Sequence, residues 1–374
     1  MKTTCPPAAF PGCLLLAVLL MVTGLHADAE VASPAAVTAG FTPEALVHEK
    51  SPNGSLSTFH LDVASVTCGD GACAVVTVRL HWNTLGRYVR YELPHGCVLT
   101  KQGHASFSDA DHAKLHAVLL DRDSPLRHFE KEKVIAPDLA VQGVDAITGA
   151  TPDMYENDVV PGAVYTCYTL WHWANGDVAD HIRKLAEKTC TDAQLVAFIE
   201  SGDESSGVFA IEQLAKRRRH DEATLDAVIG GAEDGSTALV RAALEYLQST
   251  TSETNADIYY LAIERLFPTA EKQNRLLYLG ALSKVKRPPP SEYYDRISKW
   301  IPLQTTYYEV HLLLNFLEAG AAISTRATEQ VMAVLDNSNF LIARRAFWYL
   351  ENQQLTPSQK KRMDAFRLTY HDRL

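Results

Sequence analysis

The chain has 374 residues, of which 47% are apolar, and a formal net charge of −10 at neutral pH. This length allows roughly two domains, and the apolar content is ordinary for chains that bury a core, which excludes disorder of the whole chain. The acidic balance also argues against a general nucleic-acid-binding protein, since such a protein needs a clustered basic surface.

The first 29 residues predict export. Lys2 is followed by an apolar run over residues 14–22 and then by Ala27-Asp28-Ala29, an order typical of a secretory signal peptide. The run is too short to span a bilayer comfortably, and no later stretch approaches the roughly 20 apolar residues that a spanning helix needs. We therefore expect a periplasmic or otherwise extracytoplasmic protein, with no transmembrane segment in a mature chain that begins near Glu30.

Residues 30–54 are interpreted as an N-terminal linker, after which a period of two predicts an antiparallel sheet. Apolar and polar side chains alternate between Val76 and Trp82, as in a half-buried strand. Turn residues at 83–86 and a second alternating stretch then complete a hairpin, to which residues 58–66 add a further strand.

Helices are expected to follow the hairpin. The spacing of apolar residues predicts a helix over Asp109–Leu120 with Ser108 as its N-cap, and another over residues 162–174 that ends at Asn175-Gly176. Residues 55–188 are therefore assigned to one α+β domain.

From residue 190 to residue 374 the strand pattern is absent and amphipathic helices follow one another. In pairs they give hairpins of about 30 to 45 residues, the range of HEAT-like solenoid repeats, with an irregular helical bundle as the alternative. The expected helices are 192–200, 206–219, 222–229, 236–248, 255–266, 270–285, 291–300, 306–318, 325–335, 338–351 and 357–368.

Five cysteines remain after removal of the signal peptide. Cys68 and Cys73 enclose a short loop with two glycines, and in an oxidising compartment we interpret them as a candidate structural disulfide. A catalytic dithiol is the alternative, although the two-residue spacing that lowers a thiol pKa is absent. His112 and His116 have the spacing of two zinc ligands on one helix face, but no third ligand is evident.

The sequence around Thr151 carries the most specific pattern. Asp145, Thr148, Gly149, Ala150 and Thr151 follow the order Asp, two variable residues, Ser or Thr, Gly, Ala, Thr. This resembles the flavinylation motif of FMN-binding domains in the Rnf and Nqr respiratory complexes and in exported relatives. The resemblance implies that a dedicated flavin transferase attaches FMN to Thr151 through a phosphoester bond, and that the other four residues serve recognition and positioning.

The local chemistry around Thr151 suits an anion. Thr151-Pro152 is typical of an N-cap followed by a helix start, where unpaired backbone N–H groups favour a phosphate. Gly149 lets a bulky group approach the backbone, whereas Asp153 would lie close enough to repel a phosphate. A turn with a glycine before a helix is the alternative interpretation.

These features predict an exported flavoprotein that relays electrons through covalent FMN and docks an unidentified redox protein partner through its helical repeats. The first alternative is a non-redox extracytoplasmic interaction or scaffold protein built on those repeats. The second is thiol redox chemistry at Cys68 and Cys73.

Overall fold

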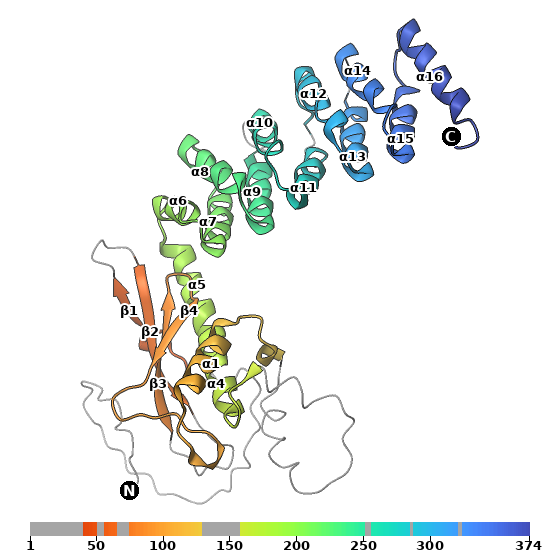
Figure 1. The fold of residues 1–374 in the computed structure, drawn as a ribbon. Helices are drawn as coiled ribbons and strands as arrows, with labels where there is room; N and C mark the ends of the chain where they lie inside the picture. The colour runs from red at the N-terminus through yellow and green to blue at the C-terminus, as the bar shows by residue number, and fades with distance from the viewer. Residues whose placement is uncertain are drawn as a thin grey trace, which may run out of the picture. The chain divides into compact units, whose positions relative to one another are not determined.

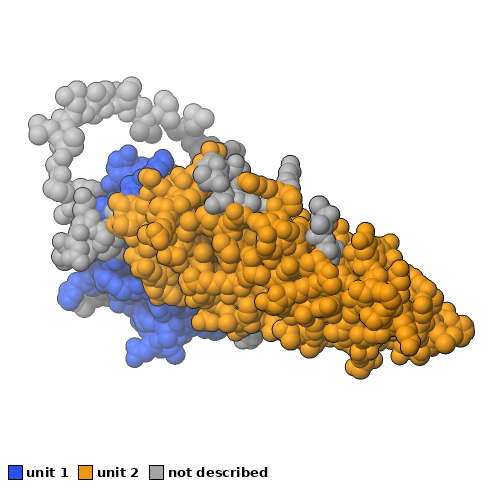
Figure 2. Space-filling model, turned by 90° about the horizontal axis from the view of Figure 1, so that it is seen from above, with its two compact units in different colours: residues 1–190 blue, residues 191–374 orange. Residues whose placement is uncertain are grey.

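The computed structural model of the chain divides into two compact units, Met1–Cys190 and Thr191–Leu374, which Figure 2 shows in separate colours. The division falls between helices α5 (Asp177–Thr189) and α6 (Asp192–Glu200). The structure describes residues 40–50, 56–65, 75–128, 158–250, 256–284, 287–320 and 324–374.

The described part of unit 1 contains a four-stranded antiparallel sheet in the order β1-β2-β3-β4 (Figure 1). The register places Val47 opposite His60, Leu61 opposite Leu80, and Leu80 opposite Tyr91. Because side chains alternate between faces, one face of β2 and β3 is almost wholly apolar and buried. The strands are β1 (Val47–Lys50), β2 (Leu56–Ser65), β3 (Val76–Asn83) and β4 (Tyr88–Glu92).

Helices α1 (Asp109–Leu120) and α4 (Val164–Asn175) contact the sheet and each other, and α5 follows α4 directly. Trp82 on β3 is fully buried, and its indole N–H donates to the carbonyl oxygen of Ala174 at 2.7 Å, which ties the sheet to α4. The core that these elements share includes Phe59, Leu61, Val78, Leu80, Trp82, Leu115, Leu119 and Tyr168.

The predicted hairpin and the helix over Asp109–Leu120 are confirmed. Ser108 caps that helix through the backbone N–H of Asp111, and the Asp111 carboxylate accepts from the Ser108 N–H in return. Two elements differ from the sequence interpretation. β1 lies inside the stretch interpreted as a linker, since four residues are too few to show a period, and α5 was not predicted because Gly176 was taken only as the end of α4.

Unit 2 consists, in its described residues, of helices α6 to α16 and the short helix η6 (Ile301–Leu303). Eight of the eleven predicted segments begin and end within two residues of the observed helices, and the ends of α7, α8 and α11 differ from the prediction by three or four residues. In Figure 1 alternate helices form two rows, and α7, α9, α11, α13 and α15 contact one another in succession. The remaining bounds are α7 (Glu204–Lys216), α8 (Glu222–Glu233), α9 (Thr237–Thr250), α10 (Ala256–Leu266), α11 (Lys272–Leu282), α12 (Ser291–Ser298), α13 (Tyr307–Glu318), α14 (Thr325–Val334), α15 (Phe340–Leu350) and α16 (Pro357–Thr369).

Among the described residues, none of the helices has both the length and the hydropathy that are needed to cross a membrane. The longest helix of unit 2, α9, carries polar and charged residues along one side, as expected of a helix that packs on one face only.

Candidate functional site in unit 1

The five motif residues Asp145, Thr148, Gly149, Ala150 and Thr151 lie outside the described residues. The structure does describe the chain on either side of them. Before the motif, Leu126 in the short helix η4 (Pro125–His128) is buried, and after it Val159 and Val160 are buried in the same core. The Val160 N–H also donates to Sγ of Cys167 on α4 at 3.3 Å. The chain on both sides of the motif is therefore anchored in the core of unit 1.

Cys68 and Cys73 also lie outside the described residues, but Cys97 is disulfide-bonded. Cys97 follows β4, whose register places it near the start of β3, the strand that comes shortly after Cys73. We therefore expect non-reducing peptide mass spectrometry to recover Cys97 linked to the peptide that contains Cys68 or Cys73. Recovery of a Cys68–Cys73 link alone, with Cys97 alkylated as a thiol, would contradict this expectation.

The two histidines of α1 bond to tyrosines of β4. Nδ1 of His112 lies 2.6 Å from the hydroxyl oxygen of Tyr91, and Nδ1 of His116 lies 3.0 Å from that of Tyr88. Burial raises the pKa of Tyr91 to about 12 and raises that of Tyr88 as well, so both hydroxyls remain protonated at neutral pH. Within the described residues no three His, Cys, Asp or Glu side chains are placed to hold a metal ion. We interpret the pairs as bonds that fix α1 on β4.

A row of ionisable side chains crosses the sheet face opposite the core. The rings of His60 and His81 are cross-strand neighbours with centroids 5.5 Å apart, and they lie 3.3 Å from Glu49 and 3.4 Å from Glu92, respectively. Both distances suit ion pairs, but the geometry gives no hydrogen bond to Nδ1 of His60 or to Nε2 of His81. Burial lowers the pKa of His81, with repulsion from Arg90 as a further cause. Because the charges on this face pair with one another, we interpret the row as structural.

A cavity of about 470 Å³ beside α4 and α5 has a different character, because arginines line it. Arg87 comes from the turn between β3 and β4, Arg122 from the stretch after α1, and Arg127 from η4. The rest of the lining is Asp123, Trp171, His172, Asn175, Gly176 and Asp180.

The three guanidinium groups of this arginine-lined cavity have no hydrogen bond or ion pair within the described part of the chain. Burial lowers the pKa of Arg122, and the neighbouring charges of Arg87 and Arg183 lower it further, while the carboxylates of Asp180 and Asp123 act in the opposite direction. Arginine nevertheless stays charged at neutral pH, so the cavity holds positive charges that repel one another.

His172 adds a buried polar atom to the cavity wall. The residue is 8% exposed, and its Nε2 has no hydrogen-bond partner. Burial lowers the pKa of His172, while a hydrogen bond to the backbone of Leu126 acts in the opposite direction. Sequence reasoning missed this cavity because its residues come from separate elements and follow no local motif.

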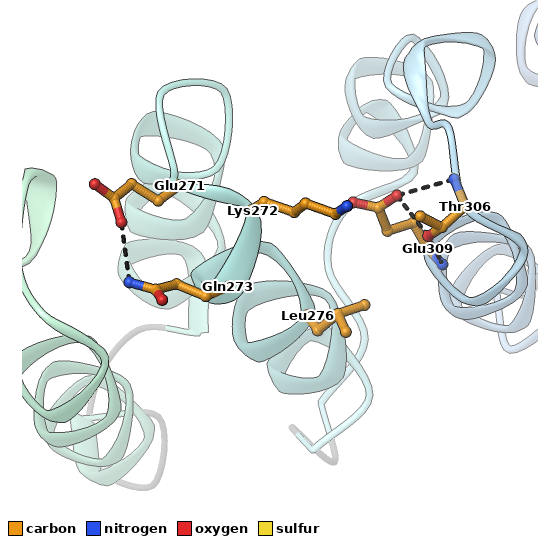
Figure 3. A pocket seen from close by; sticks show the side chains of 6 residues that line it. All are labelled: Glu271, Lys272, Gln273, Leu276, Thr306 and Glu309. Carbon is orange, nitrogen blue, oxygen red and sulfur yellow. Dashed lines mark hydrogen bonds between the residues drawn. The ribbon is translucent and has the colours of Figure 1, made fainter.

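A larger cavity, of about 690 Å³, lies in unit 2 where the starts of α11 and α13 face each other. Figure 3 shows Lys272 of α11 extending toward Glu309 of α13, with Leu276 beside the hollow. The Glu309 carboxylate accepts hydrogen bonds from the N–H and the hydroxyl of Thr306, and thereby caps α13. Because the Glu309 carboxylate already bonds to the N-cap residue of its own helix, we do not assign it to a ligand. We interpret the hollow as a groove between neighbouring helices.

Comparison of the chain with protein-family models, with curated proteins and with solved structures gives no match.

Proposed function

We propose that the protein is an exported flavoprotein that carries FMN on Thr151 and relays electrons outside the cytoplasm. The motif from Asp145 to Thr151 carries this proposal. The signal-like sequence at residues 1–29 supports it, and so does the anchoring of the chain on both sides of the motif, because a cofactor carrier must hold its attachment point near a folded core.

Attachment would form one bond and break one bond. Oγ of Thr151 would bond to the phosphorus of FMN and lose its proton, while the phosphoanhydride bond of a flavin dinucleotide breaks and releases a nucleoside monophosphate. The chain's part is to present the hydroxyl to the flavin transferase, for which Gly149 and Ala150 leave the approach open. Bound FMN would supply transfer of one or two electrons between a donor and an acceptor protein.

The helical unit would dock the redox partner. The two rows of alternating helices in Figure 1 support a HEAT-like repeat description, in which each helix pair contacts its neighbours and the array offers an extended surface. Exposed side chains such as Tyr308, Leu303 and Trp348 give unit 2 apolar contact points.

A non-redox interaction protein is the second candidate, and the size of unit 2 favours it. Residues 191–374 make up half of the chain and lie wholly outside the flavin motif. On this view unit 1 would be an adaptor without flavin, and the purified protein would be colourless even when an active transferase is present.

The deciding experiment is coexpression of the exported protein with a flavin transferase, followed by intact and peptide mass spectrometry. We expect the wild type to gain the mass of one FMN less one water on the Thr151 peptide, and Thr151→Ala to gain nothing. Thr148→Ser is the matched control, because the motif accepts serine at that position and loading should persist. An unmodified wild type beside a fully modified control flavoprotein would refute the proposal and favour the interaction protein.

A further inference from the structure

The arginine-lined cavity of unit 1 has no role in the attachment chemistry described above. We propose that it is a binding site for a small phosphate monoester that also carries hydroxyl groups. The proposal stands on described residues alone and does not depend on flavin attachment at Thr151.

The positive charge of the cavity is built from independent parts. Arg87, Arg122 and Arg127 converge on one hollow without any carboxylate bonded to them. The N-terminus of α5 adds to them, since Gly176 is its N-cap and offers no side chain to the free N–H groups of the first turn. A bound anion would relieve the mutual repulsion of the guanidinium groups and accept hydrogen bonds from them.

His172 forms part of the cavity wall and is 8% exposed. Its Nε2 is inaccessible and has no hydrogen-bond partner among the described residues, so a ligand in the cavity does not reach this nitrogen. The imidazole therefore shapes the wall, and the arginines supply the contacts to an anion.

The acidic side chains of the lining narrow the ligand class. Asp123 and Asp180 would repel a ligand that is anionic throughout, but they accept hydrogen bonds from hydroxyl groups. A ligand with a single carboxylate would leave many N–H donors of the three arginines unused. A phosphate monoester offers three oxygens, each of which can accept from a planar guanidinium group, and so fits the cavity better. The volume of about 470 Å³ falls within the range of small-ligand sites, and Trp171 gives it an aromatic wall.

The close packing at Gly176 keeps the wall in place. A Cβ at this position would lie 2.5 Å from the carbonyl oxygen of His172, so the chain passes from α4 to α5 without room for a side chain. The glycine thereby holds the N-terminus of α5 close to the end of α4, where both helices border the cavity.

The test uses isothermal titration of the mature full-length protein carrying Thr151→Ala, so that covalent flavin contributes nothing. The probes are inorganic phosphate, glycerol phosphate, FMN and riboflavin. We expect the three phosphate-bearing probes to bind and riboflavin to bind at least tenfold more weakly than FMN; FMN binding tighter than glycerol phosphate would identify the flavin nucleotide as the source of the phosphate.

Variants then assign the binding to the cavity. Arg87→Gln with Arg122→Gln should weaken phosphate-ester binding by about 100-fold, since each charge-assisted hydrogen bond is worth roughly tenfold or more. Arg326→Gln on α14, an exposed arginine remote in sequence, is the control and should change nothing. If the double variant does not fold, Arg122→Lys, which keeps the charge and loses the fork, should weaken binding by about tenfold. Equal affinity of the arginine variants and the control, or equal binding of riboflavin and FMN, would overturn the proposal.

Discussion

Replacement of Gly86 by alanine is expected to destabilise unit 1 by about 3 to 5 kcal/mol. Gly86 lies in the turn between β3 and β4 with a φ of +72°, a conformation that costs an L-residue about 1 to 2 kcal/mol. A Cβ there would also overlap the carbonyl oxygen of Ala179 on α5 and lie 3.0 Å from its carbonyl carbon. Both partners are backbone, so relief requires the turn to move away from α5.

Gly96→Ala separates the cost of a positive φ from the cost of the steric overlap with α5. Gly96 has a φ of +85°, but a Cβ there would meet nothing within 4 Å. We expect this control to cost only about 1 kcal/mol, the conformational part alone. Urea unfolding of both variants and the wild type, followed by the fluorescence of the five tryptophans, which include the buried Trp82, measures the difference. Equal costs for the two glycines would show that the turn does not pack against α5 as described.

This turn illustrates what the sequence could predict and what it could not. The hairpin was predictable because alternation and turn residues are local signals, and Ser108 marked the start of α1 by the same kind of local chemistry. The contact between Gly86 and Ala179 joins residues far apart in the chain, and no local sequence pattern near either residue predicts it.

Helix boundaries in unit 2 were predictable for the same reason. At least seven of the eleven helix starts have a residue whose side chain bonds to a first-turn N–H group, so the signal lies within four residues, whereas α11 and α12 begin without such a bond. These N-caps include Thr191, Asp203, Asp221, Thr306, Ser324, Asn339 and Thr356.

The arginine-lined cavity could not be predicted because its chemistry is distributed. In sequence, Arg87 resembles a solvated turn residue, and Arg122 and Arg127 resemble charges in a loop. His172 sits among aromatic residues that predict a core helix. Only the packing of the turn, η4 and α4 around one hollow brings them together, and such packing depends on the whole core of unit 1.

The second large effect on the free energy of unfolding is expected at the charge pair between Glu318 of α13 and Arg345 of α15. Arg345 is buried, with a side chain 8% exposed, and its two terminal nitrogens each donate to a Glu318 carboxylate oxygen at 3.0 Å. It also donates to Oδ1 of Asn315 at 2.8 Å and to Nδ1 of His311 at 3.2 Å. The Glu318 side chain is 42% exposed. Water can therefore hydrate the Glu318 carboxylate if its partner is removed, but it cannot reach the Arg345 guanidinium in the same way.

This difference predicts an asymmetry between the single variants. Glu318→Ala should cost about 3 kcal/mol, because it leaves a buried guanidinium without its counter-charge. Arg345→Met should cost only about 1 kcal/mol, because methionine keeps most of the packing and the remaining carboxylate is hydrated. The double variant should resemble Arg345→Met, and urea unfolding followed by far-ultraviolet circular dichroism reports all three. A cost for Arg345→Met equal to that for Glu318→Ala would mean that the hydrogen bonds themselves, and not the buried charge, determine the stability of the α13–α15 contact.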